Sequence, residues 1–384
     1  MRPILIDGRP LQGDSAGRGI GTYLRGLLGG MAEIGVLDRV SLLGSGSGGG
    51  TGARIRTREG ETAIPAGARV PRLERRAQVL ADPVLVALAL RRSRALLYHA
   101  VEQGQPLRSA MPVVVTVHDL IPFLLPGYSW RSRLLRRPGM RLIRRADAVI
   151  TPSRATALDC IRGAGVAEDR IHVVPHGLRP GCRPATEDTV AAMRRRFGLV
   201  RPYLLGVGTF EPRKGLPHLV AVTRRLRRDH DVDLVVAGSQ GIFQPSVRAQ
   251  LALLGGHGRD LGFVGDADLP ALYTGAAAFV FPTAYEGFGL PLLEAMGCGT
   301  VAVAFANSSL PEVAGEAAVL VPDGDRRALG DALVRLLSDP EERARRRRLG
   351  LEQAARFTWT AAARRTLSVY EEVLGEQLGG PGAP

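Results

Sequence analysis

The chain has 384 residues, 45% of them hydrophobic and 23% charged, which is ordinary globular composition and long enough for two domains of similar size. Its formal charge of +14 would attract polyanions, but aromatic residues are only 5% and form no stripe with basic ones, which argues against nucleic-acid binding. Only one of the 51 basic residues is lysine, so the charge partly reflects GC-rich coding that favours arginine.

The cysteines and the hydrophobic pattern bear on the compartment. Cys160, Cys182 and Cys298 are odd in number, far apart and without metal-ligand spacing, so we expect reduced thiols. The most apolar stretch, residues 79–90, is too short to span a bilayer and contains Asp82. The first residues read as a strand rather than a signal peptide. We therefore expect a cytoplasmic protein, with a peripheral position at the inner face of the membrane as the alternative.

The first half of the chain alternates apolar runs with helical patterns, which is typical of a parallel α/β sheet. Strands are expected over residues 4–6, 95–99, 113–117, 148–151 and 171–174, and helices over residues 22–34 and 79–92. Ser153 is expected to cap a helix N-terminus. Residues 44–67 begin with a glycine- and serine-rich run, and we expect a mobile loop there.

Two loops of this half lie where open α/β sheets bind ligands. The glycine-rich segment at Gly17, Arg18 and Gly19 follows the first strand and would let the backbone approach a diphosphate, although a plain turn explains it equally well. His118 and Asp119 follow the strand at residues 113–117, and the histidine could either contact a substrate or end the strand.

Residues 130–145 combine arginines with leucines and could contact an anionic membrane or an acidic acceptor. Pro138 and Gly139 interrupt this pattern, which favours a solvated helix face instead. Residues 177–186 contain two prolines and two glycines and are expected to link the two domains.

The second half repeats the alternation of strands and helices. Strands are expected over residues 203–207, 232–237, 261–265, 276–281 and 300–304, and a helix over residues 216–228. Asp339, Pro340 and Glu342 together predict the start of a later helix.

Arg213 and Lys214 follow the strand at residues 203–207, in a loop that begins at Gly208. Both precede a predicted helix N-terminus, where two cations are unfavourable unless they share an anion. Such a local conflict is typical of a functional site.

The stretch over residues 283–296 carries the strongest signal. It reads as a strand end, a glycine-bearing loop and a helix N-terminus, which would point the amides of residues 288–290 at a phosphate. Glu286 and Glu294 flank that position, and a carboxylate there would bind sugar hydroxyls rather than phosphate. Each glutamate alone fits a solvated turn or a helix-dipole residue, but the whole pattern indicates a sugar nucleotide.

The run Glu-Gly-Phe-Gly-Leu-Pro-Leu-Leu-Glu from Glu286 to Glu294 resembles the E-x7-E signature of retaining glycosyltransferases of family four. That family implies the GT-B fold, an α/β arrangement of two Rossmann-like domains facing a cleft, with a C-terminal helix crossing back to the first domain. It also implies that Glu286 contacts the transferred sugar and Glu294 the ribose. The donor-binding residues implied are Gly19, Gly208, Arg213, Lys214, Glu286, Gly287, Phe288, Gly289, Leu290 and Glu294.

The resemblance implies roles for the rest of the site as well. Its implied catalytic residues are His118, near the transferred sugar, with Arg213, Lys214 and Glu286, and its implied acceptor-binding residues are Gly17, Arg18 and Asp119. The expected domains are an acceptor domain over residues 1–180, a nucleotide-sugar domain over residues 187–358, a crossover helix over residues 359–376 and a disordered tail over residues 377–384.

The expected activity is retaining transfer of a sugar from a GDP- or UDP-sugar to an acceptor hydroxyl, in surface-glycan or secondary-metabolite biosynthesis. Three Asp-x-Asp pairs, at residues 231/233, 266/268 and 323/325, could bind a divalent metal, but each also fits a turn or helix cap. We expect no metal and no cofactor. The expected partners are the nucleotide sugar and a hydroxyl acceptor, without nucleic acid and with membrane contact as a less favoured alternative. A membrane-associated enzyme with a lipid acceptor is one alternative, and a basic nucleic-acid-binding protein is a weaker one.

Overall fold

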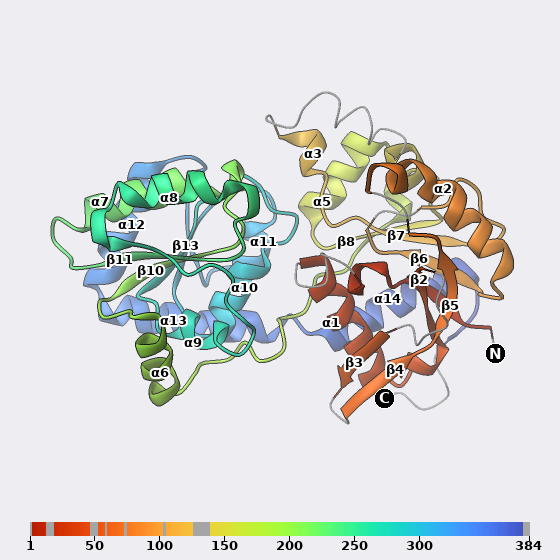
Figure 1. Cartoon of the computed structure of the whole chain (residues 1–384), viewed down its shortest axis with the longest axis horizontal. Helices are drawn as coiled ribbons and strands as arrows, with labels where there is room; N and C mark the ends of the chain where they lie inside the picture. Colours follow the sequence, from red (N-terminus) through yellow and green to blue (C-terminus); the bar gives the residue numbers. More distant parts are fainter. Residues whose placement is uncertain are drawn as a thin grey trace. The chain divides into compact units, whose positions relative to one another are not determined.

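The computed structural model describes residues 2–12, 19–46, 53–57, 60–72, 75–102, 105–125 and 139–378. The chain forms two compact units (Figure 1). The first comprises Met1–Gly177 together with Phe357–Pro384, and the second comprises Leu178–Arg356. The chain therefore returns to its first unit near the C-terminus. Of the linker expected over residues 177–186, all but Gly177 belongs to the second unit.

The first unit is built on a parallel sheet of seven strands in the order β5-β2-β1-β6-β7-β8-β9. Its strands are β1 (Ile4–Asp7), β2 (Val40–Ser45), β5 (Ala66–Val70), β6 (Leu97–Ala100), β7 (Val113–Thr116), β8 (Ala148–Thr151) and β9 (Ile171–Val173). Its helices include α1 (Gly19–Glu33), α2 (Arg75–Arg92), α3 (Ile121–Leu124), α5 (Arg154–Asp159) and α14 (Trp359–Leu374).

Both faces of this sheet are covered, which explains why its strands are continuous apolar runs. In β1, Ile4 and Ile6 point into the core shared with α1 and α14, whereas Leu5 points into the core shared with α2. This alternation follows from the two-residue period of a strand.

The C-terminal helix α14 packs closely on α1 in the first unit. A Cβ atom on Gly26 would lie 2.1 Å from the Trp359 ring, and one on Gly30 would lie 2.2 Å from the Trp359 carbonyl oxygen. Only glycine allows this approach. The helix predicted to cross back therefore does so, because two glycines of α1 leave room for it.

The second unit is built on a parallel sheet of six strands in the order β12-β11-β10-β13-β14-β15. Its strands are β10 (Tyr203–Val207), β11 (Asp233–Ala237), β12 (Gly258–Asp260), β13 (Ala278–Phe281), β14 (Ala302–Phe305) and β15 (Val319–Val321). Its helices are α6 (Glu187–Phe197), α7 (Leu216–Leu226), α8 (Gln244–Ala252), α9 (Leu269–Thr274), α10 (Leu290–Gly297), α11 (Leu310–Ala314), α12 (Arg326–Ser338) and α13 (Pro340–Ala355). Helices α7, α8 and α12 share one core with the sheet, and α9, α10 and α13 lie on the other side (Figure 1).

Two predictions of local structure are wrong. Residues 44–67 were expected to be a mobile loop, but they include the antiparallel pair β3 (Ala53–Thr57) and β4 (Gly60–Ile64) and the start of β5, which pairs with β2. Ile55 and Ile64 are buried, so a few apolar residues outweigh the low-complexity composition. The strand expected over residues 261–265 is instead β12, three residues earlier, since its short polar run at the sheet edge lacks an apolar pattern.

Other local predictions are confirmed. Ser153 accepts a hydrogen bond from the Thr156 amide at 3.1 Å, and Asp339 accepts one from the Glu342 amide at 2.9 Å, as helix caps do. Residues 126–138 lie outside the described residues, as do residues 379–384 of the disordered tail predicted over residues 377–384. At the start of that tail the prediction is wrong, because Leu378 is buried and its amide donates to Glu371 at 2.8 Å. In the described end of the basic segment, Leu142 is buried while neighbouring arginines are exposed, as on a solvated helix face.

Candidate donor site

The second unit brings Arg213, Lys214 and Glu286 together. β10 and β13 are parallel neighbours, so the loops at their carboxyl ends meet at one sheet edge. Arg213 and Lys214 lie in the short 3-10 helix η6 (Pro212–Lys214), which ends at Gly215. Gly215 has φ of +70°, and a Cβ atom there would lie 2.0 Å from the Pro282 carbonyl oxygen, so this approach of the two loops requires glycine.

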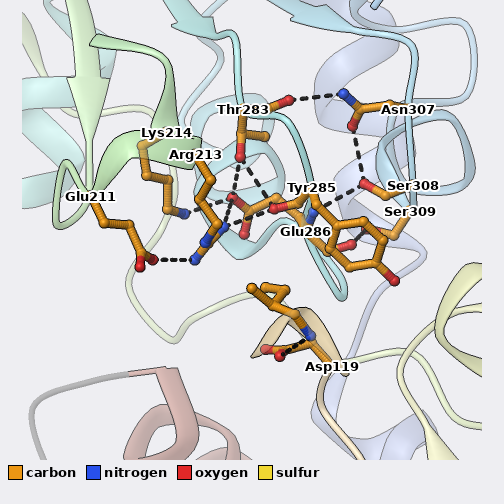
Figure 2. A network of polar contacts seen from close by, with 11 residues as sticks. Asp119, Glu211, Arg213, Lys214, Thr283, Tyr285, Glu286, Asn307, Ser308 and Ser309 are labelled. Carbon is orange, nitrogen blue, oxygen red and sulfur yellow. Dashed lines mark hydrogen bonds and ion pairs between the residues drawn. The ribbon is translucent and has the colours of Figure 1, made fainter. Parts of the chain in front are cut away.

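Glu286 is the centre of an ion-pair cluster (Figure 2). Its Oε1 accepts hydrogen bonds from Lys214 Nζ at 2.7 Å, from Arg213 at 2.8 Å and from the Thr283 hydroxyl at 2.8 Å. Arg213 also pairs with Glu211 at 2.7 Å. Two cations before a helix N-terminus were expected to share an anion, and in this structure that anion is the Glu286 carboxylate.

Burial and charge compete in this cluster. Burial by itself would raise the pKa of Glu286, but Lys214 and Arg213 together hold that pKa below its ordinary value. Burial lowers the pKa of Lys214 and the neighbouring Arg213 lowers it further, while Glu286 opposes both effects. The carboxylate is therefore ionised at neutral pH, and the cluster keeps both signs of charge away from water.

The loop carrying Glu286 is held from its other side by Asn307, Ser308 and Ser309 (Figure 2). Ser308 Oγ accepts the Glu286 amide hydrogen bond at 3.0 Å, and Ser309 Oγ donates to the Glu286 carbonyl at 2.9 Å. Asn307 donates to the Thr283 carbonyl at 2.9 Å. Ser308 has φ of +45°, a conformation that non-glycine residues rarely adopt, and the hydrogen bonds hold it there.

Glu294 lies in α10 with other partners. It is 2% exposed, its Oε1 accepts from Arg179 Nε at 2.7 Å, and its Oε2 accepts from the Tyr273 hydroxyl at 3.0 Å. Arg179 also pairs with Asp266 at 2.8 Å. The second glutamate of the motif is therefore fixed on both of its oxygens.

The predicted anion-binding elements are in place at the start of α10. Gly289 has φ of +95° and precedes the helix, with Pro291 in its first turn. Gly287, Phe288 and Gly289 are buried, and Leu290 is partly exposed. The first amides of a helix lack intrahelical acceptors, so this end can bind an anion.

Gly208 lies beside Lys214, since a Cβ atom on it would be 3.9 Å from Lys214 Nζ. Its backbone carbonyl and that of Gly238 accept hydrogen bonds from Gln240 Nε2, and Gln240 Oε1 accepts the Phe210 amide at 2.8 Å. The buried Gln240 thus ties the loop after β10 to the loop after β11.

The predicted residues of the first unit form a separate group. His118 Nε2 donates to the Val101 carbonyl at 2.8 Å, its Nδ1 lies 3.4 Å from His176 Nε2, and its ring packs edge-on against Tyr23. Burial lowers the pKa of His118 to about 4, so it is neutral at pH 7. Asp119 caps the amide of Ile121 at 3.0 Å.

The glycine loop of this unit is only partly described. Gly19 begins α1 and is exposed, whereas Gly17 and Arg18 lie outside the described residues.

Several residues around the two glutamates had no individual role predicted from the sequence: Arg179, Gln240, Tyr273, Thr283, Asn307, Ser308 and Ser309. Arg179 lies in residues 177–186, which were predicted to be a linker because of their prolines and glycines, so no binding role was expected there. The Asn-Ser-Ser triplet at residues 307–309 follows a predicted strand, and its polar side chains at the same sheet edge are the signal from which its contacts could have been predicted.

The Asp-x-Asp aspartates have protein partners in the structure. Asp233 pairs with His257, Asp268 with Arg196, and Asp325 caps α12 through the Ala328 amide. Among the described residues, no group of three or more His, Cys, Asp or Glu side chains is arranged to hold a metal ion. None of the described helices is both long enough and apolar enough to cross a membrane.

Comparison with known proteins identifies the class. In fold, the chain resembles a sucrose-phosphate synthase from Thermosynechococcus elongatus, with a TM-score of 0.76 and 22% identity over 98% of this chain and all of the other. It also resembles Anabaena Alr3699/HepE solved with UDP-glucose, with a TM-score of 0.74 and 19% identity over 98% and 100% of the two chains. The two parallel-sheet units are those of the GT-B fold.

Sequence comparison then gives the family. Residues 17–181 match the model described as Glycosyltransferase Family 4, and residues 194–352 match Glycosyl transferases group 1. O-antigen chain mannosyltransferase B of Escherichia coli is 31% identical over 76% of this chain and 78% of its own length. The MMP alpha-(1->4)-mannosyltransferase of Mycolicibacterium hassiacum is 32% identical over 70% and 67%. The chain belongs to glycosyltransferase family four and is a glycosyltransferase.

Proposed function

We propose that the protein transfers a sugar, with retention of configuration, from a GDP- or UDP-sugar to an acceptor hydroxyl. The observation that carries the proposal is the cluster of Arg213 and Lys214 around Glu286, next to the N-terminus of α10. Cations and helix amides at one sheet edge suit a diphosphate, and a buried carboxylate beside them suits sugar hydroxyls.

Arg213 and Lys214 would stabilise the charge that develops on the departing diphosphate. In the structure, the positive charges of Arg213 and Lys214 are balanced by the negative charges of Glu211 and Glu286. A diphosphate would draw Arg213 away from Glu211 and would share both cations with Glu286. Such groups, already oriented before the reaction, are among the strongest contributions to enzymatic rate.

We propose a same-face mechanism rather than a covalent one. The three donors to Glu286, two of them cations, stabilise its carboxylate charge and so lower its strength as a nucleophile. We propose that the leaving phosphate oxygen takes the proton of the acceptor hydroxyl, without a divalent metal. His118, neutral and held by Val101, would contact the transferred sugar, and Asp119 and the loop at Gly17 and Arg18 would contact the acceptor.

The relatives favour one acceptor class. Two of them are named as mannosyltransferases, one of these acting on an O-antigen chain. We therefore propose mannosyl transfer to a growing surface glycan in the cytoplasm, ahead of a secondary-metabolite acceptor or a lipid acceptor at the membrane surface.

The test is thermal stabilisation of the purified protein by GDP, UDP, dTDP and ADP, each with and without EDTA. At 100 times its dissociation constant, a nucleotide should add about 2.7 kcal/mol of stability. A selective shift by GDP or UDP that survives EDTA is expected, followed by transfer from the matching mannose or glucose donor. Loss of the shift in EDTA would contradict metal independence, and no shift with any nucleotide would contradict the donor class.

A further inference from the structure

Glu294 has an unusual environment for a carboxylate. It is 2% exposed, and a buried carboxylate is costly unless it is paired and hydrogen-bonded. Arg179 Nε donates to one of its oxygens at 2.7 Å and the Tyr273 hydroxyl to the other at 3.0 Å. Burial and the neighbouring Glu294 raise the pKa of Tyr273 well above its ordinary value, so this hydroxyl is protonated and donates.

These two hydrogen bonds leave part of the acceptor capacity of the Glu294 carboxylate unused by the described residues. A carboxylate has about four lone-pair directions, two on each oxygen. Among the described residues Glu294 has these two donors, so one acceptor position remains on Oε1 and one on Oε2. Two acceptor positions side by side match two hydroxyls on neighbouring carbons, as on the ribose of a nucleotide.

Arg179 reaches Glu294 from a segment that is itself anchored. Its guanidinium also donates to Asp266 at 2.8 Å. A Cβ atom on Gly297 of α10 would lie 2.7 Å from the Leu178 side chain, so the segment lies directly on that helix. Farther along, the Ala185 amide donates to Thr274 Oγ1 at 3.1 Å. The guanidinium therefore approaches the carboxylate along a fixed direction.

Arginine suits this task for two reasons. Burial alone would lower the pKa of Arg179, but its pairing with Glu294 and Asp266 raises that pKa above the ordinary value, so it stays charged at any working pH. Its planar fork also binds two carboxylates in fixed directions, which a lysine ammonium cannot do.

We propose that Arg179 is a positioning residue of the donor site: with Tyr273 it orients Glu294 so that both carboxylate oxygens accept the 2′- and 3′-hydroxyls of the donor ribose. This inference rests on the proposed function, and it gives the start of the second unit a part in nucleotide recognition.

The experiment measures affinity by calorimetry for GDP and UDP and for their 2′-deoxy and 3′-deoxy forms. The variants are Arg179→Gln, Arg179→Lys and Tyr273→Phe. Arg196→Gln is the matched control, because Arg196 forms an ion pair with Asp268, two residues after the Asp266 partner of Arg179. The Lys and Phe variants keep a charge or a ring in place and serve if the Gln variant does not fold.

The wild type and the control should prefer the ribonucleotide by about 10-fold or more over each deoxy form, since each lost bond to a charged group leaves polar atoms unpaired. The Arg179 variants should bind the ribonucleotide at least about 10-fold more weakly and discriminate less than about 3-fold. A stabilising role alone would weaken all nucleotides equally and leave the discrimination intact, and that result would overturn the inference.

The proposed function fails in a different way. If neither GDP nor UDP binds the wild type, the donor class is wrong and the inference falls with it. If either ribonucleotide binds and the Arg179 and Tyr273 variants discriminate like the wild type, only the role of Arg179 is refuted.

Discussion

Lys214 is the only lysine in the chain, and its ammonium lies between the Glu286 carboxylate and the ring of Phe281, 5.1 Å from the ring centre. Replacing it with Met keeps the aliphatic packing and removes the charge. We expect Lys214→Met to lower turnover by about 100-fold or more, because one of two cations on the leaving diphosphate is lost. Steady-state kinetics with the donor identified by thermal shift measures this.

The fold should survive that change. Glu286 keeps Arg213 and Thr283 as hydrogen-bond donors, so its charge stays compensated. Arg225→Met is the matched control, since it removes a surface ion pair with Asp331 and should leave turnover unchanged. A Lys214→Met variant with wild-type turnover and an intact fold would remove the ammonium from the mechanism.

At the scale of elements, the segment between β14 and α11 supports the loop after β13. Ser308→Ala removes the acceptor of the buried Glu286 amide, which should cost about 1–3 kcal/mol of unfolding free energy. Ser308→Gly removes the same acceptor but relieves the positive φ, so it should be more stable than the Ala variant by about 1 kcal/mol. Urea unfolding measures both.

Ser309 provides the internal control for this argument. It also bonds to the loop, through the Glu286 carbonyl, but its φ of −81° is ordinary. There the order should reverse, with Ser309→Ala more stable than Ser309→Gly. If alanine is the better replacement at both positions, the backbone of Ser308 is not strained.

At the scale of the whole molecule, the two units differ in their buried histidines. His99, His118 and His176 all lie in the first unit and are buried or nearly so, and burial lowers the pKa of His99 to about 3 and that of His118 to about 4. The unfolded chain protonates these groups near pH 6.5, whereas the folded unit keeps them neutral. Stability is therefore full above pH 6.5 and falls as the pH drops toward the folded pKa values.

For His118 alone this loss should reach about 3 kcal/mol at pH 4. Trp359 is buried in the first unit, so the change in its fluorescence during urea unfolding follows that unit. The urea concentration at the unfolding midpoint should decrease as the pH is lowered from 6.5 to 5, a range above that in which carboxylates titrate. His99→Gln should be less stable at pH 7.5 but show a weaker pH dependence. An unchanged pH dependence would mean that His99 does not contribute to it.

The local units of this protein can be predicted from its amino-acid sequence. Its apolar runs placed most strands to within two or three residues, its capping residues Ser153 and Asp339 placed two helix starts, and the residues from Glu286 to Glu294 indicated the family. These features depend on neighbours along the chain. Composition gave a wrong prediction for the glycine-rich region at residues 44–67, where the burial of Ile55 and Ile64 stabilises two strands instead of a mobile loop.

Which side chains contact one another depends on how the elements pack, and this could not be predicted from the sequence. Glu286 bonds to Lys214, 72 residues away, and Glu294 to Arg179, 115 residues away in a segment whose composition suggested a linker. Parallel strands are joined by long crossovers, so residues distant in sequence come to the same sheet edge, and no local pattern records which ones. A buried carboxylate needs donors at hydrogen-bond distance, and the packing of the elements alone supplies them.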